Sequence, residues 1–154
     1  MFKTIVWATD GSPNADKALP VAKAIAQESQ APLVVVHVVQ RFATKGGLAV
    51  HADEEIVSAK LEQAVHDLAG EGLDASLEIV NHIGPQAAHT IADVARELGA
   101  DLIVVGTRGY GTIPGLLLGS VTLRLLHTAD CPVLAVPVAV AAADTPHVDP
   151  APPS

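Results

Sequence analysis

The sequence predicts an α/β fold, a doubly wound, five-stranded parallel sheet with helices on both faces. Two observations predict it: five short apolar runs rich in β-branched residues, and segments with helical spacing that alternate with them. Near-continuous apolar runs are typical of parallel strands buried on both faces. The predicted strands are Ile5 to Ala8, Leu33 to Val39, Leu77 to Val80, Leu102 to Val105 and Val133 to Val136.

The first two predicted helices have recognisable start signals. Ser12 is placed to cap the first helix, with Pro13 at its first position. Pro20 lies inside the apolar stripe of this helix, so we expect a kink or a local loosening there. The second helix begins at Asp53, which is expected to cap it, and buries residues such as Leu61.

Two further helices follow in the second half of the chain. Gly84-Pro85 opens the third helix, and Gly99 ends it. The fourth is short and runs from Gly119-Ser120 to about His127. Strand and helix in alternation imply right-handed crossovers, which places ligands outside the carboxyl ends of the strands.

Two segments fall outside this pattern. Residues Gln40 to Ala52, with Gly46-Gly47, are expected to form a mobile loop beside the crevice. Residues 139–154 are rich in Ala and Pro, which predicts a disordered tail after one domain over residues 1–138. At 154 residues the chain has the usual length of a single domain.

Composition excludes several classes of protein. The net charge of −8 argues against nucleic-acid binding and against an anionic membrane surface. One cysteine, Cys131, allows no internal disulfide, which fits a reducing compartment. The N-terminus resembles no signal peptide and no apolar run reaches membrane-spanning length, so we expect a cytoplasmic protein.

The stretch from Val105 to Thr122 carries the chemistry. A strand ends, glycines follow at once, and a later glycine leads into hydroxyl residues and a helix. Glycine lets backbone N–H groups approach an anion closely, and a helix start adds unpaired N–H donors. Arg108 can add a charged donor, and Ser120 and Thr122 can add hydroxyl donors. The stretch predicts a phosphate site.

Other nucleotide-binding signatures are absent. No G-x-x-x-x-G-K-[ST] run exists, which excludes a P-loop, and Gly11 is the single glycine after the first strand, which disfavours a dinucleotide enzyme. No nucleophile with an activating base is visible, because no histidine is placed to serve Ser12. The histidines show no metal-ligand spacing, and His37 is expected to be a packed core residue, as is Trp7.

These residues resemble the universal stress protein family. The spacing Gly106-x2-Gly109-x9-Gly119-Ser120 is similar to that family's ATP-binding motif, and the opening run from Ile5 to Ser12 is similar to its first strand and turn. The resemblance covers about residues 1 to 138. It implies the strand order 3-2-1-4-5 of adenine-nucleotide α-hydrolase-like folds.

The resemblance also implies a site and a role. Asp10 would bind ribose hydroxyls or help place the phosphates, the Val38 backbone would read the adenine edge, and Gly106 would lie against the ribose. ATP would be bound with Mg²⁺ or Mn²⁺ held mainly by the phosphates, in a sensor or regulatory module with at most slow hydrolysis or self-phosphorylation. The implied binding residues are Ala8, Thr9, Asp10, Val38, Val105, Gly106, Arg108, Gly109, Gly119, Ser120, Val121 and Thr122.

Other hypotheses stay open at this point. Family resemblance also implies a homodimer paired through the last strand, Val133 to Val136, and such a dimer could act without nucleotide. Cyclic AMP is a second candidate ligand. An adenylating or phosphotransfer enzyme is a third class, but the glycine-rich pyrophosphate loop of such ligases is missing after the first strand.

Overall fold

The five parallel strands lie in one sheet in the order β4-β2-β1-β5-β6, which confirms the predicted order 3-2-1-4-5. The computed structural model describes residues 1–50, 53–108 and 118–137. The predicted tail over residues 139–154 lies outside them, and so does Gly109. The strands are β1 (Ile5–Ala8), β2 (Leu33–Thr44), β4 (Ala75–Ile83), β5 (Leu102–Gly106) and β6 (Val133–Val136).

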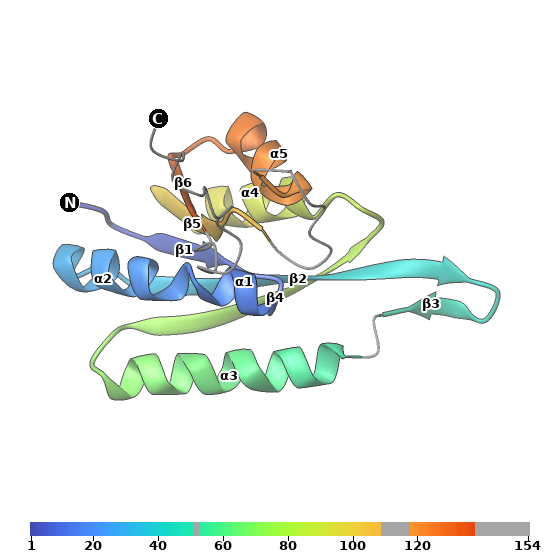
Figure 1. Cartoon of the computed structure of the whole chain (residues 1–154), viewed down its shortest axis with the longest axis horizontal. Coiled ribbons are helices and arrows are strands. Elements are labelled where there is room, and N and C mark those ends of the chain that lie inside the picture. Colours follow the sequence, from blue (N-terminus) through green and yellow to red (C-terminus); the bar gives the residue numbers. More distant parts are fainter. Residues whose placement is uncertain (51–52, 109–117, 138–154) are drawn as a thin grey trace, which may run out of the picture.

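Helices cover both faces of this sheet (Figure 1). The two faces carry separate cores, because neighbouring side chains of a strand point to opposite sides. In β1, Ile5 and Trp7 belong to one core, while Val6 and Ala8 belong to the other. The first core is covered by α2 (Leu19–Ser29) and α3 (Glu54–Gly70), and the second by α4 (Ala87–Glu97) and α5 (Ser120–Thr128), while the short α1 (Pro13–Asp16) contacts β5 and α2.

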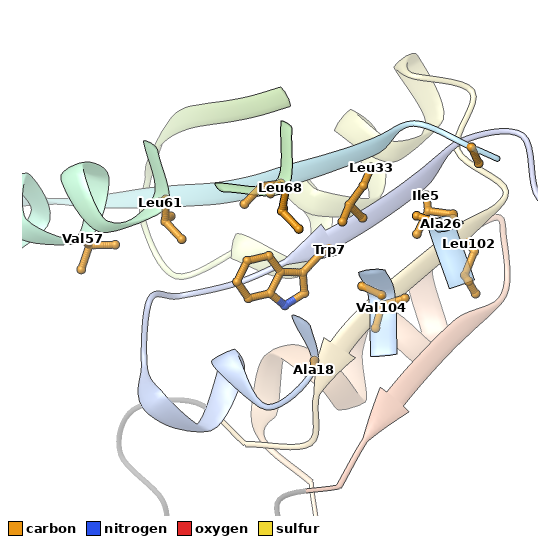
Figure 2. Packing of buried hydrophobic residues seen from close by; sticks show 13 residues of the cluster. Ile5, Trp7, Ala18, Ala26, Leu33, Val57, Leu61, Leu68, Leu102 and Val104 are labelled. Atoms are coloured by element: carbon orange, nitrogen blue, oxygen red, sulfur yellow. The ribbon is translucent and has the colours of Figure 1, made fainter. Parts of the chain in front are cut away.

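Trp7 is a core residue, as predicted. Figure 2 shows its indole among apolar side chains that include Leu61 and Leu68 of α3. The side chain is 1% exposed, and its Nε1 has no hydrogen-bond partner among the described residues. Fluorescence of this single tryptophan therefore reports directly on unfolding of the core.

The start of the helical region follows its sequence signals. The Ala15 N–H donates to Ser12 Oγ (3.1 Å), which confirms the predicted cap. The expected kink is a full break: α1 ends at Asp16 and α2 begins at Leu19, with Pro20 in its first turn. Asp53 precedes α3 as predicted, but its side chain makes no capping hydrogen bond.

The prediction of a mobile loop over residues 40–52 is wrong for most of that segment. Strand β2 continues to Thr44, turns at residues 45–46 and pairs antiparallel with β3 (Gly47–Ala49). Gly47 has a φ of +120°, a backbone conformation that suits glycine, and the Thr44 hydroxyl donates to its carbonyl (2.8 Å). Figure 1 shows this hairpin reaching past the rest of the sheet.

The strand order reverses between β1 and β5. Connections from β1 lead toward β2 and β4 on one side of the sheet, and those from β5 lead toward β6 on the other. Such a reversal leaves a crevice at the carboxyl ends of the two central strands, where ligands of doubly wound sheets bind. No helix among the described residues is long and apolar enough to cross a membrane.

Candidate functional site

A cavity of about 450 Å³ opens at this reversal point. This volume is in the usual range for small-molecule and cofactor sites. The carboxyl ends of β1, β2 and β5 form part of the wall, and the first turns of α3, α4 and α5 complete it. The lining residues are Ala8, Thr9, Asp10, Ala15, His37, Val38, Gln40, Asp53, Glu54, Val57, Ala87, Ile91, Val105, Gly106, Arg108, Gly119, Ser120, Val121 and Thr122.

The structure brings the predicted site residues together around this cavity. Every one of them lines it except Gly109, which lies outside the described residues. They come from two distant parts of the chain, residues 8–38 and 105–122. Their meeting in one place follows from the pairing of β1 with both β2 and β5.

The turn after β1 fixes the position of Asp10. Thr9 is held on both sides, because its N–H donates to Val36 O (3.0 Å) and its hydroxyl accepts from the Gly11 N–H (3.0 Å). Asp10 Oδ1 accepts from the Ser12 N–H (2.9 Å). Glycine is required at position 11, because its φ is +80° and an added Cβ would lie 2.5 Å from Val57 Cγ1.

The start of α5 forms a second wall. The Leu123 N–H donates to Gly119 O (3.0 Å), so the amide groups of residues 120–122 have no acceptor within the helix. Ser120 and Val121 line the cavity beside these donors. This wall therefore offers N–H groups that have no partner within the helix, and the positive end of the helix dipole, to an anion.

Two predicted donors in this region already have partners. The Gly119 N–H donates to Thr107 O (2.6 Å), and the Thr122 hydroxyl donates to Gly106 O (2.8 Å). In this geometry both groups hold α5 against the end of β5. Of the two predicted hydroxyl donors, Thr122 is therefore occupied and Ser120 remains available. Ser120 is exposed and lines the cavity.

Gly106 has a packing role beside its place in the cavity. An added Cβ would lie 3.2 Å from Asn14 O and 3.3 Å from Ala15 Cα. The absence of a side chain thus allows α1 to approach the end of β5 closely. The same approach brings the two halves of the predicted site together.

Sequence reasoning missed the wall that α3 forms. Asp53, Glu54 and Val57 line the cavity from the start of α3, and Gln40 lines it from β2. The sequence indicates Asp53 only as a helix cap and gives no prediction for Glu54. An acidic pair at the start of a helix that follows a central strand is the signal that would have found them.

His37 is buried as predicted, at 2% exposure, but it is not an apolar packing residue. Its Nδ1 lies 2.9 Å from Thr9 O, and its Nε2 lies 2.8 Å from Glu54 Oε2. Nothing in the sequence connects these residues, which are 28 and 17 positions from His37.

The cavity is electrically polarised. Its carboxylates are contributed by the β1–α1 turn and by α3, namely Asp10, Asp53 and Glu54, whereas its charged donor, Arg108, follows β5. Asp10 and Asp53 on the first wall can accept hydrogen bonds from hydroxyl or amino groups of a ligand, and the second wall can donate to an anion. Within the described residues, no three His, Cys, Asp or Glu side chains are grouped to hold a metal ion.

The fold and the cavity define a doubly wound α/β domain with a ligand crevice at its reversal point. Comparison with known proteins narrows this class. The chain belongs to the universal stress protein family, whose model matches residues 1–137.

Individual relatives agree with this assignment. A universal stress protein of Thermus aquaticus is 38% identical over 140 residues, which cover 88% of this chain and 99% of that protein. A universal stress protein solved in complex with cAMP is 29% identical with a TM-score of 0.64, over 88% of this chain and 96% of that one. The Archaeoglobus fulgidus protein in complex with dAMP is 29% identical with a TM-score of 0.64, over 87% of this chain and 97% of that one.

Proposed function

We propose that this protein binds ATP in the cavity at the reversal point and acts as a sensor or regulatory module. The observation that carries the proposal is the polarised cavity, with acceptor groups on one wall and an open helix start on the other. A nucleotide has the matching polarity, because its ribose carries hydroxyl donors and its phosphates are anionic. Similar proteins solved with cAMP and dAMP support an adenine nucleotide as the ligand.

In this proposal each wall has a separate task. Asp10 accepts from the ribose hydroxyls, and the Val38 backbone contacts the base. Ser120, Val121 and Arg108 donate to the phosphates. Ala8, Thr9, Val105 and Gly106 line the nucleoside, Gly109 is a further phosphate donor, and Gly119 and Thr122 hold α5 in place.

The chemistry of the site favours binding over turnover. A divalent ion bound with ATP would neutralise phosphate charge, and we propose that the phosphates hold it. Ser12 Oγ is an unsuitable nucleophile, because the side chain is 1% exposed and accepts the Ala15 N–H. Fixed N–H donors can still stabilise charge on the phosphates, so slow hydrolysis or self-phosphorylation is compatible with the site.

Calorimetric titration with Mg-ATP tests the proposed function. We expect a dissociation constant on the order of 10 μM, or about −7 kcal/mol. Cyclic AMP and GTP serve as competitors, and ATP should displace both. Absence of binding at millimolar ATP would exclude the proposed ligand, while preferential binding of cyclic AMP would reassign it.

A specific observation also favours a homodimer. Strand β6 pairs with β5 alone, so one edge of it lacks a partner in the described chain. Leu134 of β6 is 37% exposed, and Leu123 and Leu126 of the neighbouring α5 are 48% and 47% exposed. An apolar strand edge of this kind is prone to pair with another strand.

We propose that two copies pair through Val133 to Val136, and that this surface can act without nucleotide. Light scattering should give twice the mass of the chain with and without ATP. A monomer mass at tens of micromolar protein would contradict the dimer and leave the ATP proposal standing.

A further inference from the structure

The buried His37 side chain links three elements around the cavity. It belongs to β2, its Nδ1 is 2.9 Å from the Thr9 carbonyl at the end of β1, and its Nε2 is 2.8 Å from Glu54 Oε2 at the start of α3. All three residues line the cavity. The imidazole therefore connects the turn that carries Asp10 to the helix that forms the acidic wall.

The two contacts require one more hydrogen than a neutral imidazole and an ionised carboxylate possess. A carbonyl oxygen only accepts, so Nδ1 must carry a hydrogen to contact Thr9. The contact between Nε2 and the Glu54 carboxylate also needs a hydrogen on one of its two atoms. If the ring carries a single hydrogen and Glu54 is ionised, one of the two contacts joins two acceptor atoms. That contact must then break.

The additional hydrogen lies between His37 Nε2 and Glu54 Oε2, and the exposure of the two groups bears on which of them holds it. His37 is 2% exposed, whereas the Glu54 side chain is 17% exposed and lies at the cavity wall. Burial alone would disfavour an imidazolium, but the carboxylate 2.8 Å away offsets that cost and is itself open to solvation from the cavity, so we take the pair as an imidazolium beside a carboxylate. The pair then has no net charge. Loss of the hydrogen would leave it with one negative charge.

The acidic groups around the pair decide how a ligand affects this hydrogen. Asp10 from the β1–α1 turn and Asp53 from α3 line the same cavity. The phosphates of a nucleotide bound at the opposite wall would be repelled by both carboxylates across the cavity. A third negative charge, from a pair that has lost its hydrogen, would raise the cost of bringing an anion in.

The remaining charged groups nearby do not replace that hydrogen. Lys60 of α3 is engaged elsewhere, because its Nζ donates to Gly11 O (2.9 Å) and to Asp16 Oδ2 (2.5 Å). Arg108 lines the cavity after β5. On β4, Ile79 is the register partner of His37, and Glu78 beside it points to the opposite face of the sheet.

We propose that His37 and Glu54 are a positioning pair that carries an additional proton, and that binding of an anionic nucleotide is coupled to this proton. The inference rests on the proposed function. Where the free protein has lost the proton, nucleotide binding takes one proton up from solvent and restores both contacts. Affinity should be constant on the acid side and fall about tenfold per pH unit on the alkaline side.

The variant Glu54→Gln removes the need for the additional proton while it keeps both hydrogen bonds of His37. A glutamine amide can donate to Nε2 of a neutral imidazole while Nδ1–H keeps its contact with Thr9. The net charge is the same as that of the protonated pair. We expect Glu54→Gln to bind nucleotide like the unchanged protein at acid pH and more tightly at alkaline pH.

Calorimetry in buffers of different ionisation enthalpy measures the coupling. Across the pH range in which the protein stays folded, the unchanged protein should take up as much as one proton per nucleotide, and Glu54→Gln should take up none. Glu55→Gln is the matched control, because it removes the same charge from an exposed neighbouring position. It should keep the proton uptake. Absence of uptake throughout this range, or equal uptake in Glu54→Gln, would overturn the coupling.

Nitrogen NMR of the ligand-free protein decides the protonation independently of binding. Where the pair holds its proton, both His37 ring nitrogens should carry hydrogen in the unchanged protein and in Glu55→Gln, and one in Glu54→Gln. A singly protonated His37 beside an ionised Glu54, whose carboxyl carbon reports its protonation in the same samples, would overturn the additional proton. If no adenine nucleotide bound to any variant, the proposed function would fail and the coupling with it, while the spectrum would still report on the pair.

Discussion

Replacing Gly11 by alanine should lower the free energy of unfolding by about 3 kcal/mol. Two costs add at this position. The backbone has a φ of +80°, where a side chain is strained, and the new Cβ would lie 2.5 Å from Val57 Cγ1. Val57 belongs to α3, is 7% exposed and packs in the first core, so it has little room to move.

Urea denaturation followed by Trp7 fluorescence measures this change. Gly70→Ala is the matched control, because nothing lies within 4 Å of an added Cβ there and its φ is ordinary. That substitution should be neutral or slightly stabilising. The double variant Gly11→Ala with Val57→Ala should lose less stability than the sum of the two single variants, because the steric part of the cost is shared.

The same substitution bears on the site. Val57 lines the cavity, and the Gly11 turn carries Asp10. The close contact between the added Cβ and Val57 would be relieved if α3 moved away from that turn. The cavity would then be wider between the turn and α3. Equal stability of Gly11→Ala and Gly70→Ala would contradict the close packing of α3 on the turn.

The sheet could be predicted because its signals are local and strong. A parallel strand buried on both faces must be apolar at nearly every position, and β1 and β5 each show this in the sequence. The cap at Ser12 and the break before Pro20 depend on the chemistry of one or two residues. Such signals need no knowledge of the tertiary structure.

The hairpin of β2 and β3 could not be predicted on the same basis. Its residues beyond Arg41 are exposed, so burial imposes no apolar pattern on them. Phe42 and Leu48 do belong to adjacent register pairs across the turn, but the short pairing leaves only Gly46-Gly47 as a local signal. Two glycines are equally compatible with an irregular loop.

The candidate site divides in the same way. Its glycine-rich half could be predicted from residue type and spacing, whereas the wall formed by Glu54 depends on how α3 packs after a long connection. The contact of His37 with Thr9 crosses from β2 to β1 and has no sequence signature. Even within the motif, only the structure shows that the Gly119 N–H donates a hydrogen bond to Thr107 O.

Replacing Ser120 by glutamate should weaken ATP binding about 100-fold, or about 2.7 kcal/mol, without lowering stability. Ser120 is exposed at the first position of α5 and lines the cavity. A carboxylate there interacts favourably with the helix dipole, so the fold should tolerate it. The same carboxylate would compete with phosphate for the unpaired N–H groups and repel it.

Two controls make this result specific to the site. Ser120→Ala removes the hydroxyl but leaves the amide groups open, so it should weaken binding by less than about tenfold. Gln27→Glu adds the same charge at an exposed position of α2 outside the cavity and should leave binding unchanged. If Ser120→Glu bound ATP as tightly as Gln27→Glu, the phosphates would have to lie away from the start of α5. The polarity of the cavity would then need another ligand to explain it.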